Sequence, residues 1–132
     1  MIQLNTKDGR LEVDSFFIYP GLTLNEFGAL SGVVDIEKIV ENGSYASFGI
    51  KGVDDYCAAI AVYFFEQIVE RVVIFLGERY GFPPFIVTSE ERAEIDRLIK
   101  KLGGAKKYDW GSVEVADDPK GGSISVLVRY SR

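Results

Sequence analysis

The sequence of 132 residues contains no histidine and a single cysteine, Cys57. Without histidine, a Ser-His-Asp or Cys-His catalytic group cannot form, and the side chain that titrates near neutral pH without a shifted pKa is missing. Acid–base chemistry would have to use carboxylates, lysines or tyrosines whose pKa is moved by burial or by charged neighbours. A lone cysteine forms no internal disulfide, which suits a reducing compartment, and its apolar flank predicts a buried thiol.

Long apolar runs are also missing from the sequence. No run approaches the roughly 20 residues that a helix needs to cross a bilayer, so we expect no membrane span. The first ten residues lack the basic, apolar and small-residue order of a secretory signal, which predicts a cytoplasmic or already processed chain. No repeat or linker-like stretch divides the sequence, so it predicts a single domain over 1–132.

Motifs for phosphate and metal binding are missing too. The stretch 117–122, Asp-Asp-Pro-Lys-Gly-Gly, has its lysine before the glycines and a strand after them, whereas a phosphate-binding loop needs the opposite order and a helix. Its residues are typical of a turn between two strands. Asp54 and Asp55 could bind a divalent cation with Glu66 or Glu70, but no oxygen-rich ligand spacing is present. We therefore expect no metal and no cofactor.

The charge of the chain is negative and unevenly distributed. Its net charge is −5, which argues against a protein whose main task is binding nucleic-acid phosphates. Residues 35–70 carry seven acidic residues against Lys38 and Lys51, and such a field would attract a basic partner. The alternative is a solvated acidic surface that keeps the protein in solution. The seven are Asp35, Glu37, Glu41, Asp54, Asp55, Glu66 and Glu70.

The first third of the sequence predicts a hairpin and a short helix. Apolar residues alternate with polar ones over 2–13 around a Lys-Asp-Gly turn, and an extended segment over 16–19 ends at Pro20. Thr23 and Glu26 have the spacing of a capping box, in which each side chain binds a free amide at the start of a helix. That helix should place Leu24, Phe27 and Leu30 inward and end near Ser31-Gly32.

The rest of the sequence predicts five strands and a longer helix. Strands are expected over 44–50, 57–65 and 68–76, with a turn at Glu66-Gln67, and again near 113–115 and 124–130. A second capping box begins at Thr88, followed by an apolar stripe of helical spacing and the stop Gly103-Gly104. This order predicts an α+β fold, with a mostly antiparallel sheet of about six to seven strands and two helices packed on it.

Four stretches together resemble a known class of bacterial proteins. They are "SFFIYPGLTLNEF", "ENGSYASFGI", "YFFEQIVERVVIFL" and "WGSVEVADDPKGGSISVLVRY", which span most of the chain. The sequence resembles the immunity proteins of contact-dependent and related polymorphic toxin systems, small single-domain proteins encoded beside secreted toxins. The resemblance implies a non-enzymatic inhibitor that binds one cognate toxin.

If the toxin is a nuclease with a basic cleft, the acidic segment is the expected docking surface. Acidic residues would supply the charge and tyrosines would serve as aromatic anchors, because a few such residues dominate tight interfaces. We expect a monomer or a weak homodimer that binds neither nucleic acid nor membrane. The predicted partner-binding residues are Glu37, Glu41, Tyr45, Asp54, Asp55, Tyr56 and Glu70.

Two other interpretations stay open at this point. The chain could be a carrier of small ligands or a carboxylate-dependent enzyme, with a pocket between the sheet and the second helix lined by Tyr63, Phe65, Phe75 and Trp110. Alternatively, the chain could form a homo-oligomer that buries the apolar face of strand 57–65 against a second copy.

Overall fold

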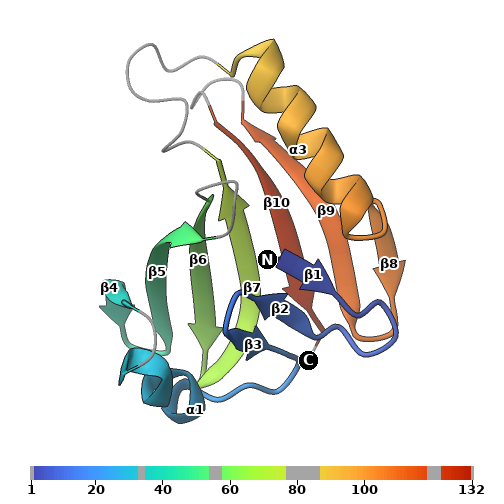
Figure 1. The fold of residues 1–132 in the computed structure, drawn as a ribbon. Coiled ribbons are helices and arrows are strands. Elements are labelled where there is room, and N and C mark those ends of the chain that lie inside the picture. Colours follow the sequence, from blue (N-terminus) through green and yellow to red (C-terminus); the bar gives the residue numbers. More distant parts are fainter. Residues whose placement is uncertain (1, 33–34, 54–57, 77–86, 119–122, 132) are drawn as a thin grey trace.

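The computed structural model describes residues 2–32, 35–53, 58–76, 87–118 and 123–131. These residues form two antiparallel sheets, the helices α1 and α3, and the short 3-10 helix η1 (Figure 1). The elements in chain order are β1 (Ile2–Leu4), β2 (Leu11–Val13), β3 (Phe16–Ile18), α1 (Leu24–Gly28), η1 (Ala29–Gly32), β4 (Glu37–Asn42), β5 (Tyr45–Val53), β6 (Ala58–Phe65), β7 (Ile68–Phe75), α3 (Ser89–Lys101), β8 (Lys106–Tyr108), β9 (Gly111–Asp118) and β10 (Ser123–Tyr130). The predicted α+β class is confirmed.

The larger sheet has seven strands in the order β4-β5-β6-β7-β10-β9-β8. The strands β4 to β7 follow one another in sequence, and so do β8 to β10, so each group is a meander of hairpins. The groups meet where β7 pairs with β10, from Phe75 opposite Ser125 to Arg71 opposite Arg129. This seam joins residues at least 50 positions apart in the sequence. The smaller sheet, β1-β2-β3, is a separate meander.

The turn between β6 and β7 confirms the prediction at Glu66-Gln67. Both residues have positive φ, 50° and 72°, as in the two-residue hairpin turns whose twist matches that of the strands. Phe65 pairs with Ile68 and Phe64 with Val69, but the register then shifts. The shift is a bulge that leaves Glu70 as the extra residue of β7.

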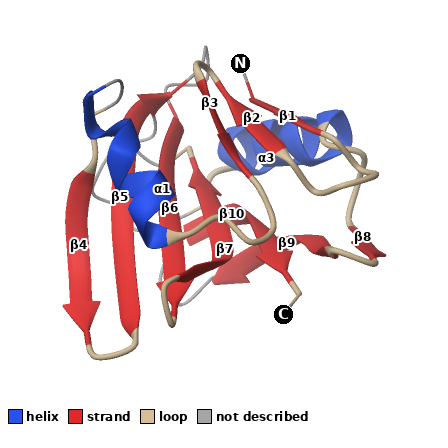
Figure 2. Ribbon diagram, turned by 90° about the horizontal axis from the view of Figure 1, so that it is seen from below, coloured by secondary structure: helices blue, strands red, loops and turns tan. Residues whose placement is uncertain are grey.

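One face of the large sheet carries the core. The small sheet, α1 and α3 all lie on this side (Figures 1 and 2). Alternating side chains of β6, β7 and β10 are buried there together with apolar residues of the covering elements. Phe27 of α1 packs against Phe64 with ring centroids 5.2 Å apart, and Ile95 and Leu98 of α3 are fully buried. The predicted apolar stripe of the second helix is confirmed.

Two hydrogen bonds fasten the small sheet to the large one. The indole Nε1 of Trp110 donates to the carbonyl of Thr6 at 2.9 Å, and the hydroxyl of Tyr130 donates to the carbonyl of Ile18 at 3.4 Å. Burial raises the pKa of Tyr130 far above its ordinary value, so this hydroxyl keeps its proton. The donors come from the end of the chain and the acceptors from its beginning.

Both helices begin at the predicted caps. The Thr23 hydroxyl accepts the amide of Glu26 at 3.2 Å, and the Glu26 carboxylate accepts the amide of Thr23 at 3.1 Å, which completes the capping box. At the start of α3, the Thr88 hydroxyl accepts the amide of Glu91 at 3.1 Å, which is one half of the predicted second capping box; between these two described residues, the reciprocal bond from the Thr88 amide to the Glu91 carboxylate is not formed. The Glu91 side chain is buried, and burial raises the pKa of its carboxyl group.

Some predicted features fall outside the described residues. Asp54, Asp55, Tyr56 and Cys57 are among them, as is the turn at 119–122. The hairpin predicted around that turn is nevertheless confirmed, because Asp118 of β9 pairs with Ser123 of β10. Within the described ranges, neither helix has the length and apolar character needed to cross a membrane.

Candidate partner-binding surface

The second face of the large sheet points away from the small sheet and both helices (Figure 2). No described helix or strand packs on it, and we call it the open face. Its side chains alternate with the core residues along each strand. Four of its residues are aromatic or β-branched and half-buried: Tyr63 and Phe65 of β6, and Val73 and Phe75 of β7. A surface of this kind suits protein–protein contact.

The register arranges the open face in rows across the strands. One row contains Tyr45, Phe65 and Ile68, which are opposite one another on β5, β6 and β7. The next row runs across the whole sheet as Val40, Ser47, Tyr63, Arg71, Arg129, Ser112 and Lys107. A third row contains Ala61, Val73, Leu127 and Glu114. The row that carries three cations therefore lies between an apolar row and a row that is apolar in its middle and ends in Glu114.

The end of the open face near β4 is apolar and exposed. Tyr45 is 57% exposed, Ile39 55% and Val40 51%. The rings of Tyr45 and Phe65 lie 4.8 Å apart between centroids, and the Ile39 side chain lies over Gly49 of the neighbouring strand. Large exposed apolar side chains that adjoin one another are typical of interaction sites.

A cluster of charged residues occupies the middle of the open face. The guanidinium group of Arg71 lies over the ring of Tyr63, with its carbon 4.3 Å from the ring centroid. Arg129 lies opposite Arg71 on the next strand, and its Nε donates to the Glu114 carboxylate at 3.2 Å. The Nε of Arg71 is buried and has no hydrogen-bond partner among the described residues.

The predicted partner-binding residues that the structure describes do not all lie on the same face of the sheet. Glu37 pairs with Gly49 and lies on the open-face side of β4, as does Tyr45 on β5. Glu41 pairs with Ala46, a core residue, and therefore lies on the opposite side of the edge strand. Glu70 is the bulged residue of β7 and is half-buried. The described acidic residues thus do not form one patch around Tyr45.

Glu41 forms an ion pair with Lys38 on the exposed edge strand. The Lys38 Nζ lies 2.8 Å from the Glu41 carboxylate, and both side chains are more than half exposed. The hydrogen bond from Lys38 and its charge lower the pKa of Glu41, so this carboxylate stays ionised near neutral pH. Solvent screens a pair of this kind, and it contributes little to stability.

The structure overturns the predicted ligand pocket between the sheet and the second helix. Tyr63, Phe65 and Phe75 lie on the open face, whereas α3 packs on the core face. Trp110 is on the core side, stacked on Tyr108 with centroids 4.9 Å apart. The four aromatic residues therefore cannot line one cavity, because alternation along β6 and β7 directs three of them away from the helix.

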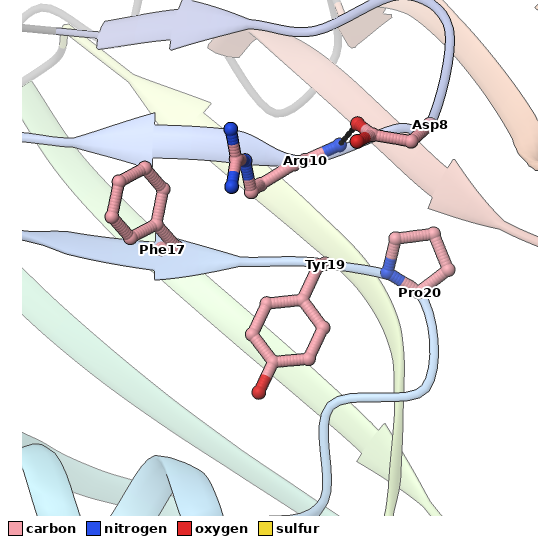
Figure 3. A pocket seen from close by; sticks show the side chains of 5 residues that line it. All are labelled: Asp8, Arg10, Phe17, Tyr19 and Pro20. Atoms are coloured by element: carbon pink, nitrogen blue, oxygen red, sulfur yellow. Dashed lines mark hydrogen bonds between the residues drawn. The ribbon is translucent and has the colours of Figure 1, made fainter.

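A hollow of 420 Å³ lies instead on the outer surface of the small sheet (Figure 3). It is lined by Asp8, Arg10, Phe17, Tyr19 and Pro20. The Arg10 guanidinium lies over the Phe17 ring, 4.9 Å from its centroid, and the Asp8 carboxylate accepts the Arg10 amide at 2.9 Å. The Tyr19 hydroxyl donates to Glu26 at 3.0 Å. These polar groups serve the local turn and the helix cap.

Metal ligands do not gather among the residues that the structure describes. Within these ranges, no group of three histidine, cysteine, aspartate or glutamate side chains is close enough to hold an ion. The predicted absence of a metal at Asp54 and Asp55 stays a prediction, because both residues lie outside the described ranges.

Sequence reasoning missed Arg71 and its contact with Tyr63. The signal in the sequence is the charged pair Glu70-Arg71 within the otherwise apolar strand predicted over 68–76. A regular hairpin closed by Glu66-Gln67 would place Glu70 opposite Tyr63, and the bulge places Arg71 there. A bulge changes which side chain faces a partner strand, and alternation alone does not reveal it.

Comparisons with known proteins give a match in structure and none in sequence. No family model and no curated protein sequence matches the chain. Its structure is similar to a chain of the solved complex "Rhs1-CT in complex with cognate immunity protein RhsI1", with a TM-score of 0.68 and 16% sequence identity. The match covers 98% of this chain and 87% of that chain. At this identity the similarity shows a shared fold over almost the whole chain.

Proposed function

We propose that this chain is an immunity protein, a non-enzymatic inhibitor that neutralises a cognate bacterial toxin by binding it directly. The observation that carries the proposal is the whole-chain similarity in fold to a chain of a complex between Rhs1-CT and its immunity protein. The resemblance of four sequence stretches to immunity proteins supports the same function independently of the structure.

The open face supports this proposal physically. An inhibitor needs an accessible surface with aromatic anchors and charged residues, since such residues dominate tight interfaces. The exposed Tyr45 beside Phe65, and the pair of Arg71 and Tyr63, provide both kinds of residue on one face. We place the toxin on this face, with the acidic edge strand β4 at the border of the contact.

The charge of the chain supports a partner with basic groups near this border. The net charge is −5, and Glu37 and Glu41 are exposed on β4. Opposite charges on the toxin would accelerate encounter, with a salt dependence typical of electrostatic steering. The absence of histidine supports inhibition by binding rather than by catalysis. Action in the cytoplasm, where an incoming toxin would be met, is part of the proposal.

Co-expression with the toxin tests the proposed function. The toxin domain encoded beside this chain is induced in a susceptible bacterium, alone and together with the chain. We expect growth arrest with the toxin alone, recovery with both, and a complex of equal stoichiometry on purification. The chain induced by itself is the control and should leave growth unchanged. Continued arrest despite expression of both proteins, or toxicity of the chain itself, would contradict the proposal.

Charge reversal tests the acidic border separately. Glu37→Lys combined with Glu41→Lys should slow association about tenfold at about 50 mM salt and much less at about 0.5 M salt, because screening removes the attraction. The matched control is Glu90→Lys combined with Asp96→Lys, two exposed reversals in α3, on the other side of the large sheet. Stopped-flow measurement of the association rate decides the outcome. An equal effect of the control, or no effect at low salt, would remove β4 from the interface.

A further inference from the structure

We infer that the row Arg71, Arg129 and Lys107 on the open face, here called the cation row, receives a carboxylate side chain of the cognate toxin. The inference deepens the proposed function and rests on it. It predicts an acidic residue on the toxin, whereas the negative net charge of this chain by itself predicts only basic residues there. The toxin would then present both signs, acidic groups over the middle of the sheet and basic groups toward β4.

Arg71 is the centre of this inference because its Nε, one of the five guanidinium donors, has no partner among the described residues. Its guanidinium is held over the Tyr63 ring, at 4.3 Å, and its Nε is buried without a partner among the described residues. It forms no ion pair with any described residue. A guanidinium has five donors in a planar arrangement that matches a carboxylate, and buried donors are normally satisfied. An acidic side chain arriving at the open face would satisfy these donors.

The neighbours of Arg71 strengthen the preference for an anion. Arg129 lies directly opposite it across the seam, and like charges in this position repel one another. Glu114 accepts from Arg129 at 3.2 Å and offsets one of the two charges. Lys107 continues the same row at the far edge. The row thus has three cations, with the Glu114 carboxylate in the neighbouring row, in a chain whose net charge is −5.

The shape of the surface gives the partner room to approach. At the end of the cation row lies an open hollow of 380 Å³, lined in part by Lys107, Ser112 and Arg129. The row also adjoins Tyr45, Phe65 and Ile68, and a partner that covers these apolar side chains would lower the local dielectric and strengthen a charge-assisted hydrogen bond. A protruding acidic residue with apolar neighbours fits this arrangement better than a nucleic acid, which the acidic chain would repel.

The test measures binding of the full-length chain to the toxin domain encoded beside it. Arg71→Met removes the donors and keeps much of the apolar stem, while Arg71→Lys keeps the charge and loses the planar group. Arg97→Met is the matched control, an exposed arginine of α3 on the other side of the molecule. We expect Kd to rise at least about tenfold for R71M, by less for R71K, and to stay within about twofold for R97M.

A double-mutant cycle then identifies the partner residue. Each exposed Asp and Glu of the toxin is changed to its amide, and one of these changes should weaken binding to the wild-type chain but not to R71M. Unchanged melting temperatures of R71M and R71K would show that the loss arises at the interface. If R71M melts markedly lower than wild type while R71K binds and melts like wild type, Arg71 acts through the fold and the inference is wrong.

The remaining outcomes separate the inference from the proposed function. If the wild-type chain binds and neutralises the toxin while R71M binds within about twofold of it, the inference is wrong and the proposed function stands. If the wild-type chain neither binds nor protects, the proposed function fails and the inference falls with it. Binding of a labelled single-stranded oligonucleotide that R71M abolishes, with toxin affinity unchanged, would reassign the row to phosphate.

Discussion

The two faces of the seven-stranded sheet are built from similar residues and have different surroundings. Phe64 and Phe65 are adjacent in β6, yet Phe64 is 1% exposed under α1 and Phe65 is half-buried on the open face beside Tyr45. Both faces of β6 and β7 are rich in β-branched and aromatic side chains. The amino-acid pattern therefore predicts that both faces are covered, whereas the described helices and the small sheet cover one of them.

The buried polar residues also differ between the two sides of the large sheet. Ser47 and Ser125 are 5% exposed on the open face, where larger neighbours surround their small side chains. On the covered side Glu91 is 6% exposed, and burial raises its pKa. Burying a small hydroxyl costs less than burying a carboxyl group, and the Glu91 carboxyl, in the first turn of α3, loses hydration. The small buried hydroxyls are compatible with an interface on the open face, whereas the raised pKa of Glu91 shows the effect of burial on the covered side.

The largest expected effect comes from truncating neighbouring phenylalanines on opposite faces. Phe64→Ala should lower the free energy of unfolding by about 3–5 kcal/mol, because it leaves a cavity against Phe27 and Phe48. Phe65→Ala should cost about 1 kcal/mol, since it removes a half-buried ring whose contacts include Tyr45. Urea denaturation measures both. Under the proposed function, F65A should also weaken toxin binding; similar unfolding costs for the two variants would refute the distinction between the faces.

A second comparison concerns the corner where the small sheet meets the large one. Gly9 has φ of +80°, and an added Cβ would lie 2.5 Å from the Trp110 ring. Gly21 has a similar φ of +85° with nothing within 4 Å. In both alanine variants the free energy of unfolding should fall by about 1 kcal/mol, because alanine disfavours the left-handed backbone. In Gly9→Ala it should fall by about 1–3 kcal/mol more, because the new methyl group displaces the indole ring. Trp110 fluorescence during thermal unfolding tests this, and equal melting temperatures would contradict the close packing.

The smallest expected effect is at Glu91. Its pKa is raised in the folded protein, so ionisation at neutral pH costs stability, and this cost vanishes as the pH falls below the pKa of the unfolded chain. Glu91→Gln should therefore raise the melting temperature slightly at pH 7, and the gain should shrink toward about pH 4. The exposed Glu90→Gln is the control and should give no gain, because it removes a favourable charge from the helix start. A gain in melting temperature that does not change with pH would show that packing, and not ionisation of Glu91, causes it.

Much of the fold could be predicted from the sequence because its signals are local. The capping box at Thr23, the cap at Thr88 and the turn at Glu66-Gln67 each lie where the residues indicated. The strands predicted over 44–50, 57–65 and 68–76 correspond to β5, β6 and β7. Each signal depends on neighbours in the sequence, such as a hydroxyl three residues before an amide or an alternation of side chains.

The features that escaped prediction depend on distant contacts. All six residues of β4 are exposed, so the strand has no alternation of burial that a sequence could display. The separation into two sheets depends on how β1–β3 pack, and the place of Arg71 depends on a bulge. Of the seven predicted binding residues, Glu37 and Tyr45 share the open face and Glu41 does not. The participation of all seven in binding stays a prediction.

The seam between β7 and β10 has a consequence for the order of folding. The meanders β4–β7 and β8–β10 are built from local hairpins, which close within microseconds in simple systems. Pairing across the seam must bring together residues at least 50 positions apart, and the entropy of closing that loop is lost before the contacts compensate for it. We therefore expect the seam to limit the folding rate. Since Arg71 and Arg129 meet only across it, the surface proposed to bind the toxin is completed only when the two meanders pair.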